Sequence, residues 1–276
     1  MRGLSISRAW DESRDILARD GRLFVSIALC LVALPTLIMG LLNPKGMGDT
    51  GAPLWISVVS LIASLVALGG QLALIRLALP PSITVADAIN HGMRRMPIYL
   101  VSAIIIVVFL VLMAFPFAFI LAAMGVPIAR EETMTLPITP PVIVAVLLYL
   151  AIFCFVGVRM LMSAPVVTAE RIGPIVALKR SWVLTAGHWW MLFGFLVLFF
   201  IAAMIILVGV GAALGAIIGL SLGPVQPMSA SALVLALAHS VLNAALTTLL
   251  AVMMARIYVQ LAGRVDVEAG VPNTGI

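Results

Sequence analysis

Charged residues are scarce in this sequence, at 10% of 276 residues. Ordinary soluble domains carry about 25% charged residues, whereas 63% of the residues here are hydrophobic. This balance excludes a soluble globular domain and predicts a membrane protein. The net charge of +5 does not indicate nucleic-acid binding, because the basic residues stand beside apolar runs, where they orient membrane spans and meet anionic headgroups.

Cysteine and histidine are also rare, and their positions exclude several kinds of site. Cys30 and Cys154 both lie within apolar runs, so we expect two small buried hydrophobic side chains instead of a disulfide or metal ligands. The histidines are far apart and have no partner at zinc-ligand spacing. We therefore predict no metal and no cofactor. Because no nucleophile and base are paired, an enzyme embedded in the membrane is only a minor alternative.

Long apolar runs are abundant, and six of them reach the length of about 20 residues that a helix needs to cross the hydrocarbon core. They cover residues 23–42, 53–79, 97–125, 141–163, 189–220 and 232–261. We expect an all-α polytopic helical bundle that forms a single integral membrane domain over residues 1–276. The acidic residues near the start differ from a signal peptide, so the first span should be retained.

The basic residues fall almost entirely on one side of the predicted spans. With a cytoplasmic N-terminus, that side receives all of the 16 lysines and arginines except Lys45 and Arg130. The positive-inside rule therefore predicts that both termini are cytoplasmic, with residues 262–276 as a cytoplasmic tail.

The six spans also read as three hairpins with a common pattern. A charged cytoplasmic segment precedes each odd span, and one arginine stands near the end of each even span: Arg76, Arg159 and Arg256. An internal threefold repeat would explain the pattern. The alternative is that cytoplasmic loops resemble one another because positive-inside charge and interface helices are common. We favour the repeat.

The cytoplasmic segments themselves predict helices at the membrane interface. Residues 1–22 predict an amphipathic helix, supported by ion pairs Arg8–Glu12 and Asp15–Arg19 four residues apart. Its apolar face contains Ile6, Ala9, Trp10, Ser13, Ile16 and Leu17.

The other two cytoplasmic segments have recognisable helix ends. In the second, Thr84 and Asp87 suit a capped helix start, and we expect the helix to end near Pro97. In the third, Pro174 suits a first helical position and Gly187 suits the end.

Basic side chains near the predicted membrane surface are the candidate contacts for lipid headgroups or a partner protein. They are Arg76, Arg94, Arg95, Arg159, Lys179, Arg180 and Arg256. The three arginines of the even spans could bind a phosphate bidentately as a ring. They could equally anchor the helix ends, which is the simpler interpretation.

Polar residues inside the spans form a second candidate site, because such residues are costly in hydrocarbon. They are Gln71, His239, Asn243 and Thr247, the last three sharing one face of the final span. They could line a path for a headgroup, an ion or protons, or make interhelical hydrogen bonds, which we favour.

A row of glycines at Gly211, Gly215 and Gly219 follows the GxxxGxxxG spacing. This spacing permits close approach of another helix. Packing inside the chain is favoured over dimerisation, because six spans offer many neighbouring helices.

The stretch from Glu170 to Trp189 resembles the glycerophosphoryl diester phosphodiesterase membrane domain family of bacterial inner-membrane proteins. The shared residues are Glu170, Gly173, Pro174, Ala177, Leu178, Arg180, Ser181, Gly187 and Trp189. The resemblance implies a six-span protein of the bacterial inner membrane. Some members also carry a soluble phosphodiesterase barrel. These 276 residues contain no counterpart of that barrel, so we expect no phosphodiesterase activity.

These observations favour a non-enzymatic multi-pass inner-membrane protein that supports lipid organisation or membrane-protein assembly through its basic cytoplasmic segments. The expected partners are membrane phospholipids, and a membrane protein or a second copy of the chain is a further expectation. The alternative is a transporter of a small molecule or lipid that uses the polar face of the last span.

Overall fold

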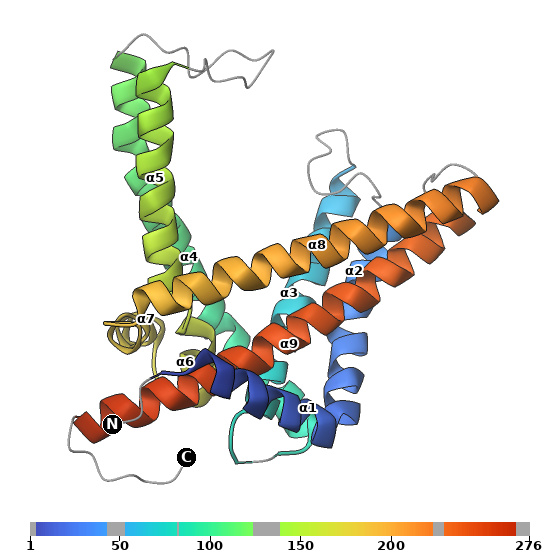
Figure 1. Cartoon of the computed structure of the whole chain (residues 1–276), viewed down its shortest axis with the longest axis horizontal. Coiled ribbons are helices and arrows are strands. Elements are labelled where there is room, and N and C mark those ends of the chain that lie inside the picture. The colour runs from blue at the N-terminus through green and yellow to red at the C-terminus, as the bar shows by residue number, and fades with distance from the viewer. Residues whose placement is uncertain (1–3, 43–52, 82, 124–138, 223–228, 269–276) are drawn as a thin grey trace.

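The computed structural model of the chain describes residues 4–42, 53–81, 83–123, 139–222 and 229–268. In these residues the secondary structure is helical, without strands, and six continuous helical segments are long and apolar enough to cross a membrane (Figure 1). This confirms the all-α, six-span prediction. The elements are α1 (Ile6–Ala28), η1 (Leu29–Ala33), α2 (Leu34–Leu42), α3 (Leu54–Ala78), α4 (Val85–Ala123), α5 (Pro140–Arg159), α6 (Ser163–Ala169), α7 (Pro174–Leu184), α8 (Trp189–Leu222) and α9 (Ala230–Glu268).

The predicted amphipathic segment and the first span form one continuous helix, so the expected boundary at residue 22 is absent. The Ser5 hydroxyl caps its start by accepting a hydrogen bond from the Arg8 amide. The π-helical segment η1 lies just before Pro35, which has no amide hydrogen to donate to the preceding turn. The Arg8–Glu12 ion pair is confirmed, but Arg19 pairs with the adjacent Asp20 instead of Asp15.

The second cytoplasmic segment also continues into its span as part of α4. Its start is capped as predicted, because the Thr84 hydroxyl accepts a hydrogen bond from the Asp87 amide at 3.2 Å. The predicted end near Pro97 is wrong, because α4 runs through Pro97 to Ala123. Inside a membrane a continuous helix satisfies most backbone groups internally, so one missing amide does not end it. Residues 124 and 125 of the predicted span lie outside the described residues.

The third cytoplasmic segment differs, since the chain breaks there into short helices. Span α5 ends at Arg159, four residues before the predicted boundary, and α6 follows. As predicted, Gly173 precedes α7 and Pro174 is its first residue. Gly187 adopts a φ of 78°, a left-handed conformation that glycine tolerates best, and α8 begins two residues later. At the other end of the chain, α9 continues to Glu268, so the predicted tail begins within a helix.

The main buried core lies at one end of the molecule, where the charged segments meet. We call this region the base: α1, α6, α7, the C-terminal end of α3, the N-terminal end of α4 and residues 251–262 of α9. Its fully buried side chains include Phe24, Met162, Val166, Leu184 and Tyr258. The face of α1 that was expected to lie on the membrane instead packs in part on this core, since Ala9 and Ser13 are buried.

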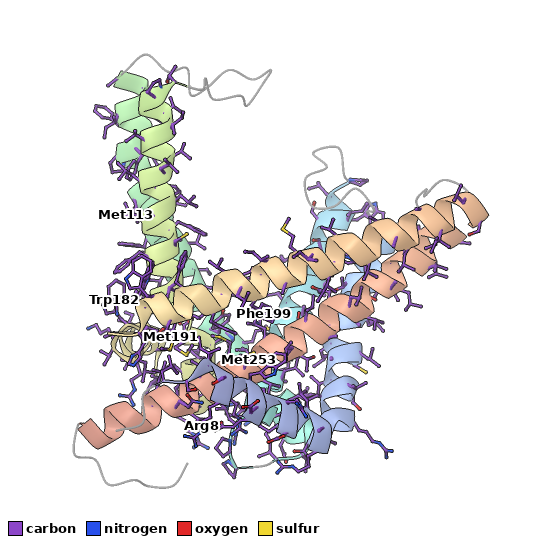
Figure 2. The ribbon with its side chains drawn as sticks, in the orientation of Figure 1. Arg8, Met113, Trp182, Met191, Phe199 and Met253 are labelled. Carbon is purple, nitrogen blue, oxygen red and sulfur yellow. The ribbon has the colours of Figure 1, made fainter. Side chains whose placement is uncertain are left out.

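Hairpins α4/α5 and α8/α9 extend from the base in different directions (Figure 1). Hairpin α4/α5 stands apart from the rest, and its side chains project into the surroundings (Figure 2). Phe115 and Phe119 are 64% and 76% exposed. In a membrane, such apolar surfaces face lipid. The hairpin meets α8 close to the base, where the Trp189 indole nitrogen donates to the Phe155 carbonyl oxygen at 3.4 Å.

Candidate functional site

The arginines of the even spans bond to backbone carbonyl groups in the base. Arg256 donates to the Ala78 carbonyl oxygen at 2.7 Å, and Arg76 donates to the Leu79 carbonyl oxygen at 3.4 Å. These are carbonyls at the C-terminal end of α3, where positive side chains are favourable. Both arginines therefore stabilise the end of α3, which fits the anchoring interpretation.

Arg159 occupies a separate position and does not complete a ring with the other two. Its guanidinium donates to the Trp182 carbonyl oxygen at 3.3 Å near the end of α7. The guanidinium carbon lies 5.0 Å from the centre of the Trp182 ring and 5.3 Å from that of Phe155, within the range of cation–π attraction. The side chain is therefore engaged within the protein.

Glu170 and Arg180, the charged pair of the resembling stretch, bond to each other. Arg180 Nε lies 3.2 Å from Glu170 Oε1, and the hydroxyl of the buried Tyr258 donates to the same oxygen at 2.9 Å. The carboxylate thus joins α7 to α9. Arg180, a predicted lipid contact, has a structural partner, and Tyr258 was missed because it lies 88 positions away in the chain.

A different set of basic groups lies in the neighbourhood of His91. The His91 Nε2 atom lies 2.8 Å from the Thr168 carbonyl oxygen, which joins α4 to α6. Arg76, Arg95 and Arg171 lie close enough to the imidazole for their charges to act on it. We call these four residues the basic cluster. They come from α3, from α4 and from the connection between α6 and α7, so the fold assembles the cluster from distant segments.

The basic cluster carries positive charge that no acidic side chain offsets by direct contact. Among the described residues, none of its arginines forms an ion pair with a carboxylate. Arg171 is exposed and Arg95 is half-buried, so both guanidinium groups are accessible from the surroundings. The sequence predicted Arg76 and Arg95 but missed His91 and Arg171. The only sequence signal for them was their place in the charged segments.

The two remaining predicted contacts, Arg94 and Lys179, are exposed on α4 and α7. Neither forms an ion pair within the described ranges of the chain. They add positive charge to the surface of the base.

The predicted intramembrane polar residues do not form one site. His239 lines a cavity between α2, α3, α8 and α9, whereas Gln71, Asn243 and Thr247 are not among its lining residues. Among the described residues, no hydrogen bond joins these four side chains to each other or to another helix. The expected interhelical hydrogen bonds are therefore absent from this part of the structure.

The glycine row on α8 is not a packing face within the described chain. A Cβ added at Gly211, Gly215 or Gly219 would have no described atom within 4 Å outside its own helix, so the expected close packing inside the chain is wrong. The close approach occurs instead between α3 and α4. A Cβ at Gly92 would lie 2.8 Å from both the Ala73 amide nitrogen and the Gly69 carbonyl oxygen.

The cysteines are free, as predicted, but they are not buried. Cys30 is exposed and Cys154 is half-buried, because the spans that carry them turn these faces outward. In the described ranges, no three acidic, histidine or cysteine side chains are grouped so that they could hold a metal ion.

Comparison with known proteins relates the fold to a family without assigning it an activity. Residues 4–261 match the model of a domain of unknown function (DUF7847). No curated protein and no solved structure matches the chain. The resemblance to the glycerophosphoryl diester phosphodiesterase membrane domain stays a prediction.

Proposed function

Since the chain belongs to the DUF7847 family, whose function is unknown, we propose from its geometry that it is a non-enzymatic multi-pass membrane protein that binds anionic phospholipid headgroups. The observation that supports this proposal is the basic cluster around His91. A phosphate accepts several charge-assisted hydrogen bonds and matches the fork of an arginine side chain. Through this contact the protein would organise lipids, or lipids and a partner membrane protein, at the base.

We further propose that the base lies at the cytoplasmic surface of the bacterial inner membrane, with both termini in the cytoplasm. The distribution of basic residues supports this orientation, because cytoplasmic loops carry an excess of lysine and arginine. The cytoplasmic leaflet is rich in anionic lipid and attracts basic segments. The basic cluster, Arg94 and Lys179 would then meet the same headgroup layer.

The proposal is tested by removing two arginines of the cluster that have no helix-capping bond. In the double variant Arg95→Gln, Arg171→Gln, we expect the affinity for phosphatidylglycerol to fall by at least about tenfold, because hydrogen bonds to charged groups each contribute about 1.5–3 kcal/mol. Native mass spectrometry of the purified protein, titrated with phosphatidylglycerol or phosphatidylcholine, measures the bound lipid.

The matched control removes the same charge from α1. Arg14 and Arg22 are exposed and form no ion pair within the described residues. The variant Arg14→Gln, Arg22→Gln should bind phosphatidylglycerol within about threefold of the parent protein, as expected for dispersed surface charges. Equal losses of affinity in the two double variants would show that net charge alone explains the effect. That result would overturn the proposal of a defined headgroup site.

A second candidate function is transport of a small molecule or lipid, and the cavity beside His239 is the observation that favours it. A transport path would let water or substrate reach this cavity from both sides of the membrane. Of the four polar residues predicted for such a path, only His239 lines the cavity, so headgroup binding is the better supported proposal.

A further inference from the structure

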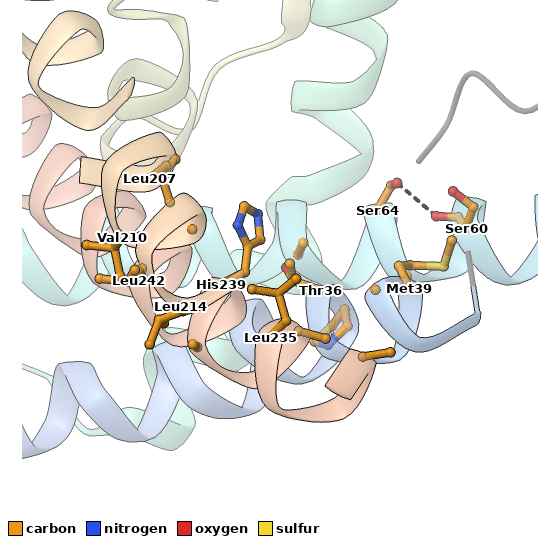
Figure 3. Close-up of a pocket in the computed structure, with 18 residues that line it drawn as sticks. Thr36, Met39, Ser60, Ser64, Leu207, Val210, Leu214, Leu235, His239 and Leu242 are labelled. Atoms are coloured by element: carbon orange, nitrogen blue, oxygen red, sulfur yellow. Dashed lines mark hydrogen bonds between the residues drawn. The ribbon is translucent and has the colours of Figure 1, made fainter. Parts of the chain in front are cut away.

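The cavity between α2, α3, α8 and α9 has the size of a small-molecule site. Its volume is about 660 Å³, within the range of about 300–1,000 Å³ that is usual for ligand pockets. Side chains from all four helices surround it (Figure 3). It lies in the spans, away from the basic cluster, so it is independent of the proposed headgroup site.

The lining of the cavity selects a ligand with an apolar body. Most of its surface is formed by leucine, valine, alanine and glycine, and no lysine, arginine, aspartate or glutamate is present among the described lining residues. The cavity is bounded by helices long and apolar enough to span a membrane, so an apolar ligand suits its surroundings. A charged headgroup inside it would have no partner of opposite charge and would be strongly disfavoured.

His239 provides the main polar contact in the cavity. Its imidazole points from α9 toward the space between the helices (Figure 3), and it has no hydrogen bond to another described residue. The hydroxyls of Thr36, Ser60 and Ser64 also line the cavity. Those of Thr36 and Ser64 already donate to their own helices at 2.8 Å and can only accept further hydrogen bonds, whereas a neutral imidazole can donate one and accept one.

Two backbone features border the cavity. Pro35 and Thr36 lie within three residues of the end of the π-helical segment η1, and such segments are frequent at functional sites. On the other side, Gly211 lines the cavity without a side chain, and nothing described lies within 4 Å of the position of a Cβ. A larger residue at position 211 would occupy the ligand space.

We propose that this cavity binds a neutral lipid, with a long hydrocarbon body and one hydroxyl or carbonyl group that hydrogen-bonds to His239. The apolar lining holds the hydrocarbon body, and the absence of charge in the lining excludes a phospholipid headgroup. The single polar group stabilises the complex through His239, because the imidazole would otherwise lie in an apolar setting without a partner.

The probe for this site is a long-chain alcohol that carries a photoreactive diazirine and an alkyne, with the matching alkane as its counterpart. After illumination of the protein in lipid nanodiscs, peptide mass spectrometry locates the labelled residues. We expect the alcohol to label α2, α3, α8 or α9 at the cavity. His239→Leu should reduce this labelling about fivefold, as expected for the loss of one hydrogen bond, and leave labelling by the alkane unchanged.

Filling the cavity gives a second, independent variant with a matched control. Gly211→Phe should abolish labelling by the alcohol, whereas Gly219→Phe places the same ring on an exposed part of α8 outside the cavity and should leave it unchanged. If the alcohol and the alkane label the cavity equally and His239→Leu has no effect, the proposed hydrogen bond to His239 is overturned. The cavity would then hold any lipid chain. Labelling that persists in Gly211→Phe would overturn the site itself.

Discussion

Glu170 joins α7 and α9 through polar contacts. Its carboxylate accepts hydrogen bonds from Arg180 on α7 and from Tyr258 on α9. Its side chain is 24% exposed, so water screens the ion pair in part. The Tyr258 hydroxyl lies in the buried part of the contact, and its bond is the better protected of the two.

The Tyr258 contact predicts a measurable loss of stability in Tyr258→Phe. We expect the free energy of unfolding to fall by about 1.5 kcal/mol, because a hydrogen bond to a charged acceptor is lost. The control is Tyr149→Phe, whose hydroxyl donates to the neutral Leu110 carbonyl at 3.3 Å, with an expected loss of about 0.5 kcal/mol. Unfolding in mixed micelles measures both variants, and equal losses would show that the Glu170 charge adds nothing.

At the level of elements, the crossing of α3 and α4 depends on the absence of a side chain at Gly92. The helix backbones approach so closely there that a Cβ would contact main-chain atoms of Ala73 and Gly69. Main-chain atoms in packed helices cannot move aside as a flexible side chain can. The glycine row on α8 meets no such constraint.

This difference predicts opposite outcomes for two glycine-to-alanine substitutions. Gly92→Ala should lower the free energy of unfolding by about 1–3 kcal/mol, the usual cost of overpacking. Gly215→Ala should leave it unchanged or raise it by up to about 1 kcal/mol, because alanine favours the helix. Unfolding of both variants in the same micelles provides the measurement. A stable Gly92→Ala protein, or an unstable Gly215→Ala protein, would contradict the packing described for these helices.

The sequence was sufficient to predict that the six long apolar runs form helices, because an apolar run of that length has few alternatives to a helix in a membrane. The helix starts at Thr84 and Pro174 were also predictable from local chemistry. The continuity of α4 through Pro97 was not, since the surroundings determine whether a proline ends a helix. The glycine spacing also predicted close helix packing at Gly215, whereas the structure shows it at Gly92. Spacing along one helix does not identify which helix lies beside it.

For the candidate site, the sequence predicted the type of residue, arginine, but not which arginines form the site. The sequence placed arginines near one membrane surface, but it could not distinguish Arg256, which bonds to a carbonyl oxygen in α3, from Arg95, which forms no ion pair among the described residues. That distinction depends on which helix lies opposite each side chain. The convergence of Arg171 and His91 likewise arises from contacts between segments that are distant in the chain.

For the molecule as a whole, the position of the base gives the orientation a direct test. Cysteines introduced at positions 14 and 221, after Cys30 and Cys154 are replaced by alanine, lie near opposite ends of the predicted topology. A membrane-impermeant maleimide should label position 14 only in inside-out vesicles and position 221 only in right-side-out vesicles, because the basic residues favour the cytoplasm. The reverse pattern would overturn the proposed orientation.

The same labelling experiment separates lipid binding from transport. With His239→Cys in the same background, we expect labelling from neither side, because a lipid bound in this apolar cavity would exclude a water-soluble reagent. Labelling from both sides would indicate a water-accessible path and favour the transport proposal instead.

The extended position of hairpin α4/α5 has a consequence for bilayers of different thickness. Its contacts with the rest of the chain are concentrated near the base, but α4 is one continuous helix that begins in the buried core, so the tilt of the hairpin changes where α4 bends, at Pro97 or Pro116. Membrane helices meet a thickness mismatch by tilting, at a cost of fractions of a kcal/mol per Å. This hairpin can therefore adapt to a thinner or thicker membrane without transmitting the change to the headgroup layer.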